Sequence, residues 1–231
     1  MTFDLSFLAR GDHLPALLDG LLTTCKLFVV SWICGFLLAL VLANLRDVRF
    51  APVRFVAGVY LEYHRNVPTV VQMLVWYFAM PDLLPDSIRL WINRGNTEFL
   101  FAWIALSLNV SAYFAEDIRS GMRAIPHTQY EAARAIGLGA LGALVYVILP
   151  QAVRITIPTI LNRTLILFKD TSLAMAIGVS ELTYQVRNIE NATFRAFEVY
   201  FIATVTYLVI SLFIMFLGAW FSRRFAVTHK A

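Results

Sequence analysis

The strongest constraint on this chain is a set of long apolar segments that contain few charged residues. A helix needs about 20 mostly apolar residues to cross the hydrocarbon core of a bilayer. Five such segments occur: residues 27–45, 55–80, 99–115, 135–168 and 199–222. Glycine and proline interrupt the fourth, at Pro150 and Pro158 among other positions. We therefore expect an all-α integral membrane protein with five transmembrane helices.

The composition excludes a soluble globular domain. Hydrophobic residues make up 59% of the 231 residues and charged residues only 15%, whereas about a quarter of the residues in soluble domains are charged. Cys25 and Cys34 lie on opposite faces of the first expected helix, so we expect no disulfide between them. The net charge of +4 comes from basic clusters beside apolar segments. That pattern is typical of membrane topology and gives no indication of nucleic-acid binding.

The basic clusters predict the orientation of the chain, because Lys and Arg gather on the cytoplasmic side of a membrane. Clusters follow the first and third segments and close the chain: Arg46, Arg49 and Arg54; Arg119, Arg123 and Arg134; Arg223, Arg224 and Lys230. The stretches 81–98 and 169–198 are mixed in sign. Five crossings then place the N-terminus outside and the C-terminus inside.

This orientation divides the chain into three parts. Residues 1–19 are expected to lie along the outer membrane interface, because they are mildly amphipathic. Residues 20–222 form a single transmembrane domain whose first helix starts near Gly20, and residues 223–231 form a cytoplasmic tail.

A spaced set of small and turn-forming residues follows the third segment. Its members are Glu131, Ala132, Ala133, Gly137, Val147, Leu149 and Pro150. This set resembles the EAA motif of ABC importer permeases, in which isoleucine is usual where Val147 stands. The resemblance implies a short cytoplasmic helix within residues 124–142 that docks on an ATPase subunit. The two alanines allow close backbone approach, Gly137 permits the bend that ends the helix, and Glu131 can pair with a basic group.

Further motifs extend the resemblance over residues 20–222. Glu62, Arg65, Pro68 and Gln72 match a pattern of the polar amino-acid permease subfamily, as do residues 169–173. Within that subfamily, residues 65–68, 76–77 and 81–85 are most similar to glutamate/aspartate permeases.

The resemblance implies a permease subunit of a binding-protein-dependent importer in the bacterial inner (plasma) membrane. Its implied partners are a dimer of ABC ATPases, a second identical or homologous permease, and a periplasmic or lipid-anchored binding protein that delivers the amino acid. The chain itself would bind no cofactor and catalyse no reaction, and ATP would be used by the ATPase subunits.

Polar side chains inside apolar segments are candidates for the substrate path, because charges in a bilayer are costly. The candidates are Glu62, Arg65, Asn109, Glu116, Arg163, Asp170, Thr171 and Ser172. Asp170 and the two hydroxyls after it could hold the ammonium and carboxylate of an amino acid, and an arginine could attract an acidic side chain. Two structural alternatives remain: an internal ion pair between Glu62 and Arg65, and hydrogen bonds between helices.

Two other classes of protein are less well supported. An ion-coupled secondary transporter could use Glu62, Arg163 and Asp170 as relays, but the chain is short and contains no inverted repeat. A membrane hydrolase could use Ser172 with Asp170, but no histidine lies beside them in the sequence. The sequence contains no phosphate-binding glycine loop and no metal-ligand spacing.

Overall fold

The part of the chain described by the structure, a computed structural model covering residues 8, 12–46 and 48–225, is helical and contains no strand. The elements are α1 (His13–Leu45), α2 (Ala51–Asn66), α3 (Thr69–Leu74), η2 (Val75–Ala79), η3 (Met80–Leu83), α4 (Asp86–Ile92), α5 (Thr97–Arg123), α6 (His127–Ala135), α7 (Ala140–Ala143), η4 (Leu144–Ile148), α8 (Leu149–Ile155), α9 (Ile157–Asp170), η5 (Thr171–Ile177), α10 (Leu182–Thr193) and α11 (Ala196–Phe225).

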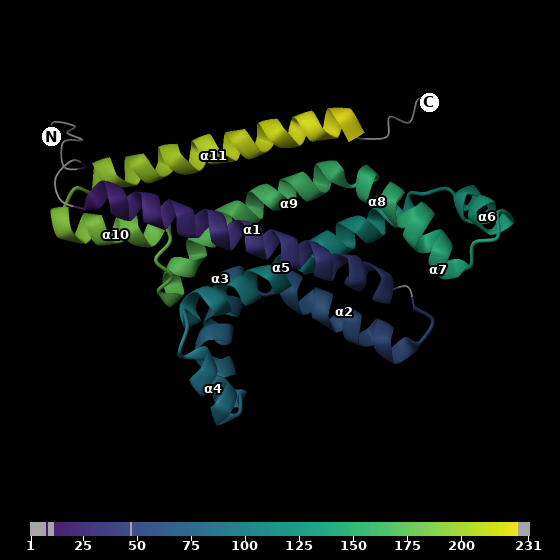
Figure 1. The fold of residues 1–231 in the computed structure, drawn as a ribbon, viewed down its shortest axis with the longest axis horizontal. Helices are drawn as coiled ribbons and strands as arrows, with labels where there is room; N and C mark the ends of the chain where they lie inside the picture. The colour runs from purple at the N-terminus through teal and green to yellow at the C-terminus, as the bar shows by residue number, and fades with distance from the viewer. Residues whose placement is uncertain (1–7, 9–11, 47, 226–231) are drawn as a thin grey trace.

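The long helices lie side by side along the longest axis of the molecule (Figure 1). α1, α5 and α11 run from the end that carries α10 towards the end that carries α6, and α2 and α9 run back. α4 projects sideways from this bundle. The arrangement therefore places the basic clusters that follow α1 and α5 at the same end as α6.

α5 is the centre of the bundle. In its most apolar stretch 61% of the residues are buried, against 28% for α1 and 11% for α11. α1 packs along it at close range, because a methyl group at Gly35 would lie 2.4 Å from Val110 Cγ1 and 3.1 Å from the Ser107 carbonyl oxygen. Real side chains cannot approach so closely, so glycine is needed at this contact.

The second apolar segment is broken between α2 and α3, at Pro68. Proline has no N–H, so the carbonyl of His64, four residues earlier, loses its helical donor. The side-chain amides of Gln72 and Asn109 donate to this carbonyl instead, at 3.0 Å and 2.8 Å. The break is thus stabilised by polar side chains from α3 and α5, as a buried carbonyl requires.

The fourth apolar segment is bent by 64° between α8 and α9. Pro158 lies in the first turn of α9 and cannot donate to the carbonyl of the preceding turn. Next to the bend, Gly121 of α5 lies against α8, where a methyl group would be 2.7 Å from the Ala152 carbonyl oxygen. The bent segment is therefore held against α5 by a backbone contact.

A buried carboxylate joins three helices at the end that carries α10. Glu181 caps α10 by accepting hydrogen bonds from the backbone N–H groups of Thr183 and Tyr184, at 2.9 Å and 2.8 Å. It also accepts from Tyr207 of α11 at 3.1 Å and from Thr24 of α1 at 3.4 Å. Burial raises the pKa of this carboxyl above its ordinary value, although the hydrogen bonds act in the opposite direction.

The structure confirms the all-α class and differs from the expectations in two details. Within the described residues, three helices, α1, α5 and α11, are long and apolar enough to cross a membrane, and the bent α7–η5 segment is a fourth candidate. The expected second span is interrupted by the break at Pro68 and by its charged residues. α1 begins at His13 and not near Gly20, so residues 13–19 form its first turns. The remaining residues of the predicted interfacial segment, except residues 8 and 12, and residues 226–231 of the tail lie outside the described part.

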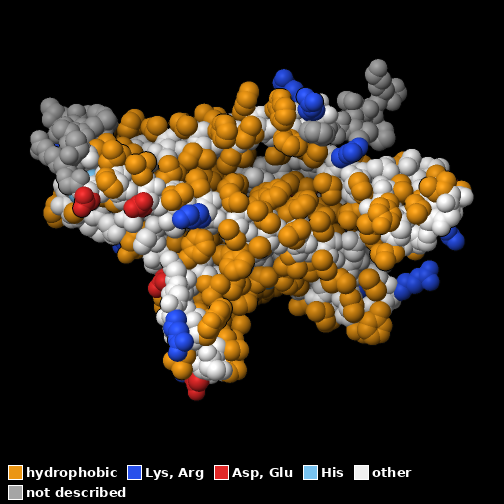
Figure 2. All heavy atoms as spheres, in the orientation of Figure 1, with side chains coloured by type: hydrophobic (Ala, Val, Ile, Leu, Met, Phe, Trp, Pro, Cys, Tyr) orange, Lys and Arg blue, Asp and Glu red, His pale blue; other side chains and the backbone are white. Residues whose placement is uncertain are grey.

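Hydrophobic side chains cover most of the visible surface of the bundle (Figure 2). α11 contributes exposed Phe213, Phe216 and Trp220, and α2 contributes Phe55 and Val56. Exposed apolar surface of this extent marks contact with a membrane or with other proteins.

Candidate functional site

A small polar cavity lies beside the break at Pro68, between α3, α5 and α9. Its volume is about 160 Å³, and its polar lining consists of Thr69, Asn109, Tyr113, Arg163 and Asp170. α9 packs against α5 and runs antiparallel to it, so Asn109 and Tyr113 of α5 share the cavity with Arg163 and Asp170 of α9. The cavity therefore brings together polar residues that are distant in sequence.

Three charged side chains, those of Arg163, Asp117 and Asp170, lie in or next to the cavity. Arg163 Nε lies 3.6 Å from Asp117 Oδ2, and its guanidinium group lies 4.5 Å from the centre of the Tyr113 ring. Asp170 Oδ2 accepts a hydrogen bond from Thr69 Oγ1 at 3.3 Å. Arg163 is thus held by an ion pair and by the face of an aromatic ring. The Asp170 carboxylate accepts a single hydrogen bond among the described residues, the one from Thr69.

The cavity includes three of the predicted path residues: Asn109, Arg163 and Asp170. Asn109 is buried and has a structural task as well, because its amide donates to the His64 carbonyl. The Tyr113 hydroxyl likewise donates to the carbonyl of Arg65, at 3.1 Å. The cavity wall and the break in the second segment are therefore one connected hydrogen-bonded unit.

The predicted hydroxyl pair does not line the cavity. Thr171 is buried and donates to the Phe168 carbonyl at 2.6 Å, and Ser172 donates to the Lys169 carbonyl at 2.7 Å. Both hydroxyls donate to carbonyls three residues earlier, in the last turn of α9.

Three further path candidates, Glu62, Arg65 and Glu116, do not line this cavity either. Glu62 is exposed, accepts a hydrogen bond from the Asn66 amide at 2.9 Å and lines a different groove. The described residues form no ion pair between Glu62 and Arg65, which was the structural alternative for these two side chains. Glu116 pairs with Arg123 at 3.2 Å.

Three residues at this site were not among the sequence candidates: Thr69, Tyr113 and Asp117. A usable signal was present for two of them, because Asn109, Tyr113 and Asp117 recur every four residues and share one face of α5. Thr69 gave no such signal, since its place depends on the break at Pro68.

The EAA residues lie on α6 at the opposite end from α10. Glu131 and Ala132 are exposed, Ala133 is buried against its own chain, and Glu131 lies 3.2 Å from His127. Two large apolar side chains near them, Ile136 and Leu141, are 77% and 73% exposed. α6 therefore presents an uncovered surface of mixed polarity.

The end of α6 has a specific backbone geometry. Gly137 has a φ of 88°, the left-handed conformation. Its N–H donates to the Arg134 carbonyl at 3.0 Å, and the N–H of Leu138 donates to the Ala133 carbonyl at 3.1 Å. This pair of bonds is the Schellman motif, which ends helices at glycine. The structure thus confirms the predicted bend at Gly137.

Comparisons with known proteins agree with these features. The sequence profile of the family described as "Binding-protein-dependent transport system inner membrane component" matches residues 14–227. The chain is 34% identical over 215 residues to the arginine transport system permease protein ArtQ of Bacillus subtilis, covering 93% of this chain and 94% of that one. It is 32% identical over 204 residues to the glutamate/aspartate import permease protein GltJ of Escherichia coli K12, covering 85% and 82%.

A solved structure gives the same fold. The crystal structure of an amino acid ABC transporter with histidines matches with a TM-score of 0.81 and 33% identity, over 97% of this chain and 100% of that chain. These relatives are transport subunits and not enzymes, which decides against the hydrolase and the ion-coupled transporter. The chain belongs to the binding-protein-dependent transport system inner membrane component family and is an ABC-type amino-acid importer permease subunit.

Proposed function

We propose that this subunit crosses the bacterial inner membrane five times, with its N-terminus outside, and forms half of a translocation path for polar amino acids. The second crossing is α2, α3 and η2, joined across the Pro68 break. The alternating helix directions and the basic residues at the α6 end support this topology. A second permease, identical or homologous, would supply the other half of the path.

The cavity between α3, α5 and α9 is the proposed contact site for the substrate, and its chemistry carries this proposal. Asp170 would accept the ammonium group of an amino acid, and Arg163 and the Asn109 amide would face the carboxylate. The volume of about 160 Å³ is smaller than the roughly 300 Å³ of drug-sized sites, which suits a single small zwitterion.

Glutamate and aspartate are the first substrates to test. The motif resemblance favours them, and Arg65 is an exposed cation beside the cavity, within electrostatic reach of Asp117. A basic amino acid is the second candidate. Because Asp117 already pairs with Arg163, Arg163, Asp117 and Asp170 together carry one net negative charge, which favours a cationic side chain.

The proposed coupling surface is α6 and the turn after it. Glu131 and Ala132 would contact a cleft of the ATPase subunit, Ala133 would anchor α6 to its own chain, and Gly137 would fix its end. ATP binding would close two ATPase subunits, and α6 would transmit that motion to α5 and α8. The ATP would be bound by those subunits and no cofactor by this chain, and a binding protein on the outer side would deliver the amino acid.

Reconstitution in liposomes tests this function. The permease would be assembled with its ATPase, any sister permease and its binding protein, and both ATPase stimulation and labelled uptake would be measured for acidic, basic and amide amino acids. Stimulation by glutamate or aspartate alone supports the acidic assignment, and stimulation by arginine or lysine alone supports the cationic one. A verified assembly that responds to no amino acid would contradict the proposed cargo.

A further inference from the structure

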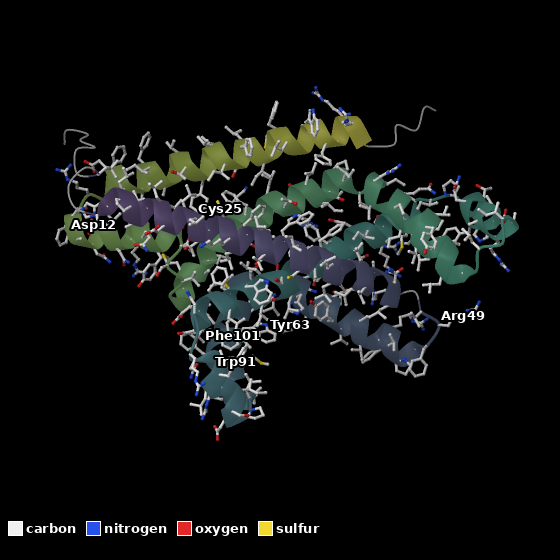
Figure 3. All side chains as sticks on the ribbon, in the orientation of Figure 1. Asp12, Cys25, Arg49, Tyr63, Trp91 and Phe101 are labelled. Atoms are coloured by element: carbon white, nitrogen blue, oxygen red, sulfur yellow. The ribbon has the colours of Figure 1, made fainter. Side chains whose placement is uncertain are left out.

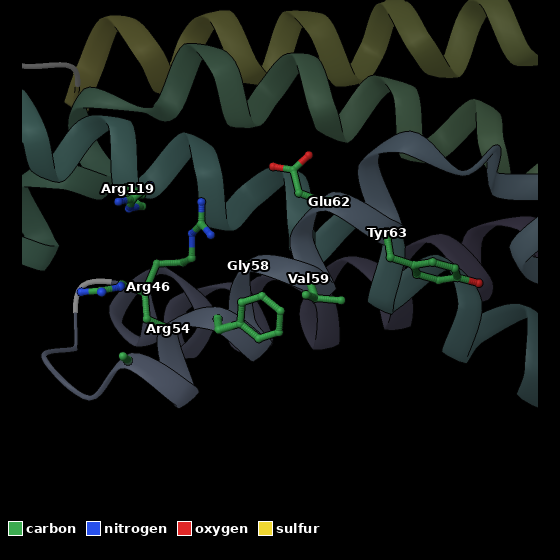
Figure 4. Close-up of a pocket in the computed structure, with 9 residues that line it drawn as sticks. Arg46, Arg54, Gly58, Val59, Glu62, Tyr63 and Arg119 are labelled. Carbon is green, nitrogen blue, oxygen red and sulfur yellow. The ribbon is translucent and has the colours of Figure 1, made fainter.

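A groove between α1, α2 and α5 is lined by three arginines and has a volume of about 830 Å³. Arg46 follows the last residue of α1, Arg54 lies in the first turn of α2, and Arg119 lies near the end of α5. Figure 4 shows these three side chains at one end of the groove and Tyr63 at the other. The groove is separate from the cavity that contains Asp170.

At the cationic end of this groove, Arg46 has a hydrogen-bond donor that is not used within the described part of the chain. The buried Nε atom of Arg46 has no hydrogen-bond partner among the described residues, and its guanidinium group lies over Gly58, where a methyl group would be 2.4 Å from Nη1. Among the described residues that line the groove, the one carboxylate is that of Glu62, which is held by Asn66. Arg46 and Arg54 together with Glu62 leave a net positive charge without counting Arg119, which favours an anionic ligand.

The rest of the groove is apolar and open. Phe55 and Val59 of α2 line it and are 72% and 52% exposed. An anion that is bound only by charge needs no such wall, whereas a molecule with a hydrocarbon chain does. The combination of a cationic end and an exposed apolar wall therefore indicates an amphipathic anion.

We propose that this groove binds an anionic phospholipid of the inner leaflet. Arg46, Arg54 and Arg119 hold the phosphate, and an acyl chain lies along Phe55 and Val59. The basic end of the bundle is the cytoplasmic end in the proposed topology, and basic pockets between helices on that side suit anionic head groups. The inference uses that topology but not the substrate or the coupling mechanism, so a binding assay tests it separately from transport.

The experiment is native mass spectrometry of the assembled permease–ATPase complex, after equilibration with phosphatidylglycerol or with phosphatidylcholine of the same acyl chains. We expect selective retention of phosphatidylglycerol, about fivefold weaker in Arg46→Gln and in Arg54→Gln, since one basic residue near a membrane contributes about that factor. Arg54→Lys should retain most of the binding. Arg49→Gln is the matched control, because Arg49 is exposed on the same loop and points away from the bundle (Figure 3).

Four results would overturn the proposal. The first is equal retention of the two lipids by the wild-type complex. The second is a loss in Arg49→Gln as large as that in Arg54→Gln. Displacement of the lipid by excess glycerol phosphate would identify a site for soluble phosphate, and a short cross-link between two copies carrying Arg54→Cys would identify an interface between permeases. Variants are compared only after gel filtration confirms their assembly with the ATPase.

Discussion

Substitution of Gly137 tests whether the bend that ends α6 is needed for coupling. No atom lies within 4 Å of a methyl group added there, so Gly137→Ala introduces no clash. The destabilisation by this substitution comes only from the φ of 88°, a backbone conformation that costs a residue with a Cβ atom about 1–2 kcal/mol. That energy lowers the population of the native helix end by a factor of about 5–30. Asparagine tolerates this conformation, so Gly137→Asn should have a smaller effect.

Proline at this position should have the largest effect. It fixes φ near −65° and removes the N–H that donates to the Arg134 carbonyl. The assay is binding of the ATPase subunit together with stimulation of ATP hydrolysis by the loaded binding protein. The control is Gly139→Ala, where φ is −66° and the space is also open. Wild-type docking and uptake in Gly137→Pro would refute the assignment of this segment to coupling.

Three other substitutions test the cavity and the packing. Asp170→Asn should weaken uptake roughly tenfold to a hundredfold, the value of a hydrogen bond to a charged group, whereas Ser172→Ala should leave uptake unchanged; equal losses would contradict the site. Gly121→Ala should lower the free energy of unfolding by about 1–3 kcal/mol through overpacking, measured by unfolding in detergent. Gly95→Ala, whose methyl group would meet its nearest atom at 3.7 Å, is its control, and equal midpoints would refute the steric argument. The raised pKa of the Glu181 carboxyl means that the folded protein binds more protons than the unfolded chain, so stability should fall as pH rises above about 4, the ordinary pKa of a glutamate carboxyl. Glu181→Gln should remove that part of the pH dependence of thermal unfolding, and an unchanged profile would exclude this carboxyl as its source.

The candidate cavity was only partly predictable from sequence. Asn109, Arg163 and Asp170 were found because polar residues in apolar segments are unusual. Thr171 and Ser172, which are also path candidates, do not line this cavity. Sequence does not show this, because a hydroxyl that donates to a carbonyl of its own helix looks the same in sequence as one that faces a ligand. Asp117 was overlooked beside Glu116, since adjacent residues on a helix point in directions about 100° apart and only packing decides which one faces α9.

The sequence by itself determined the helical membrane class, the family, the location of the basic end and the bend at Gly137. These properties depend on local composition and spacing, which are read along one helix at a time. The tertiary structure decided which polar residues meet. The His64 carbonyl freed by Pro68 accepts hydrogen bonds from both Gln72 and Asn109, and Arg163 reaches Asp117 across two antiparallel helices. These polar contacts depend on how far each helix is rotated and shifted against its neighbours. The rotation and shift are set by close packing between helices, as at Gly35 and Gly121. The sequence of one helix does not specify such packing.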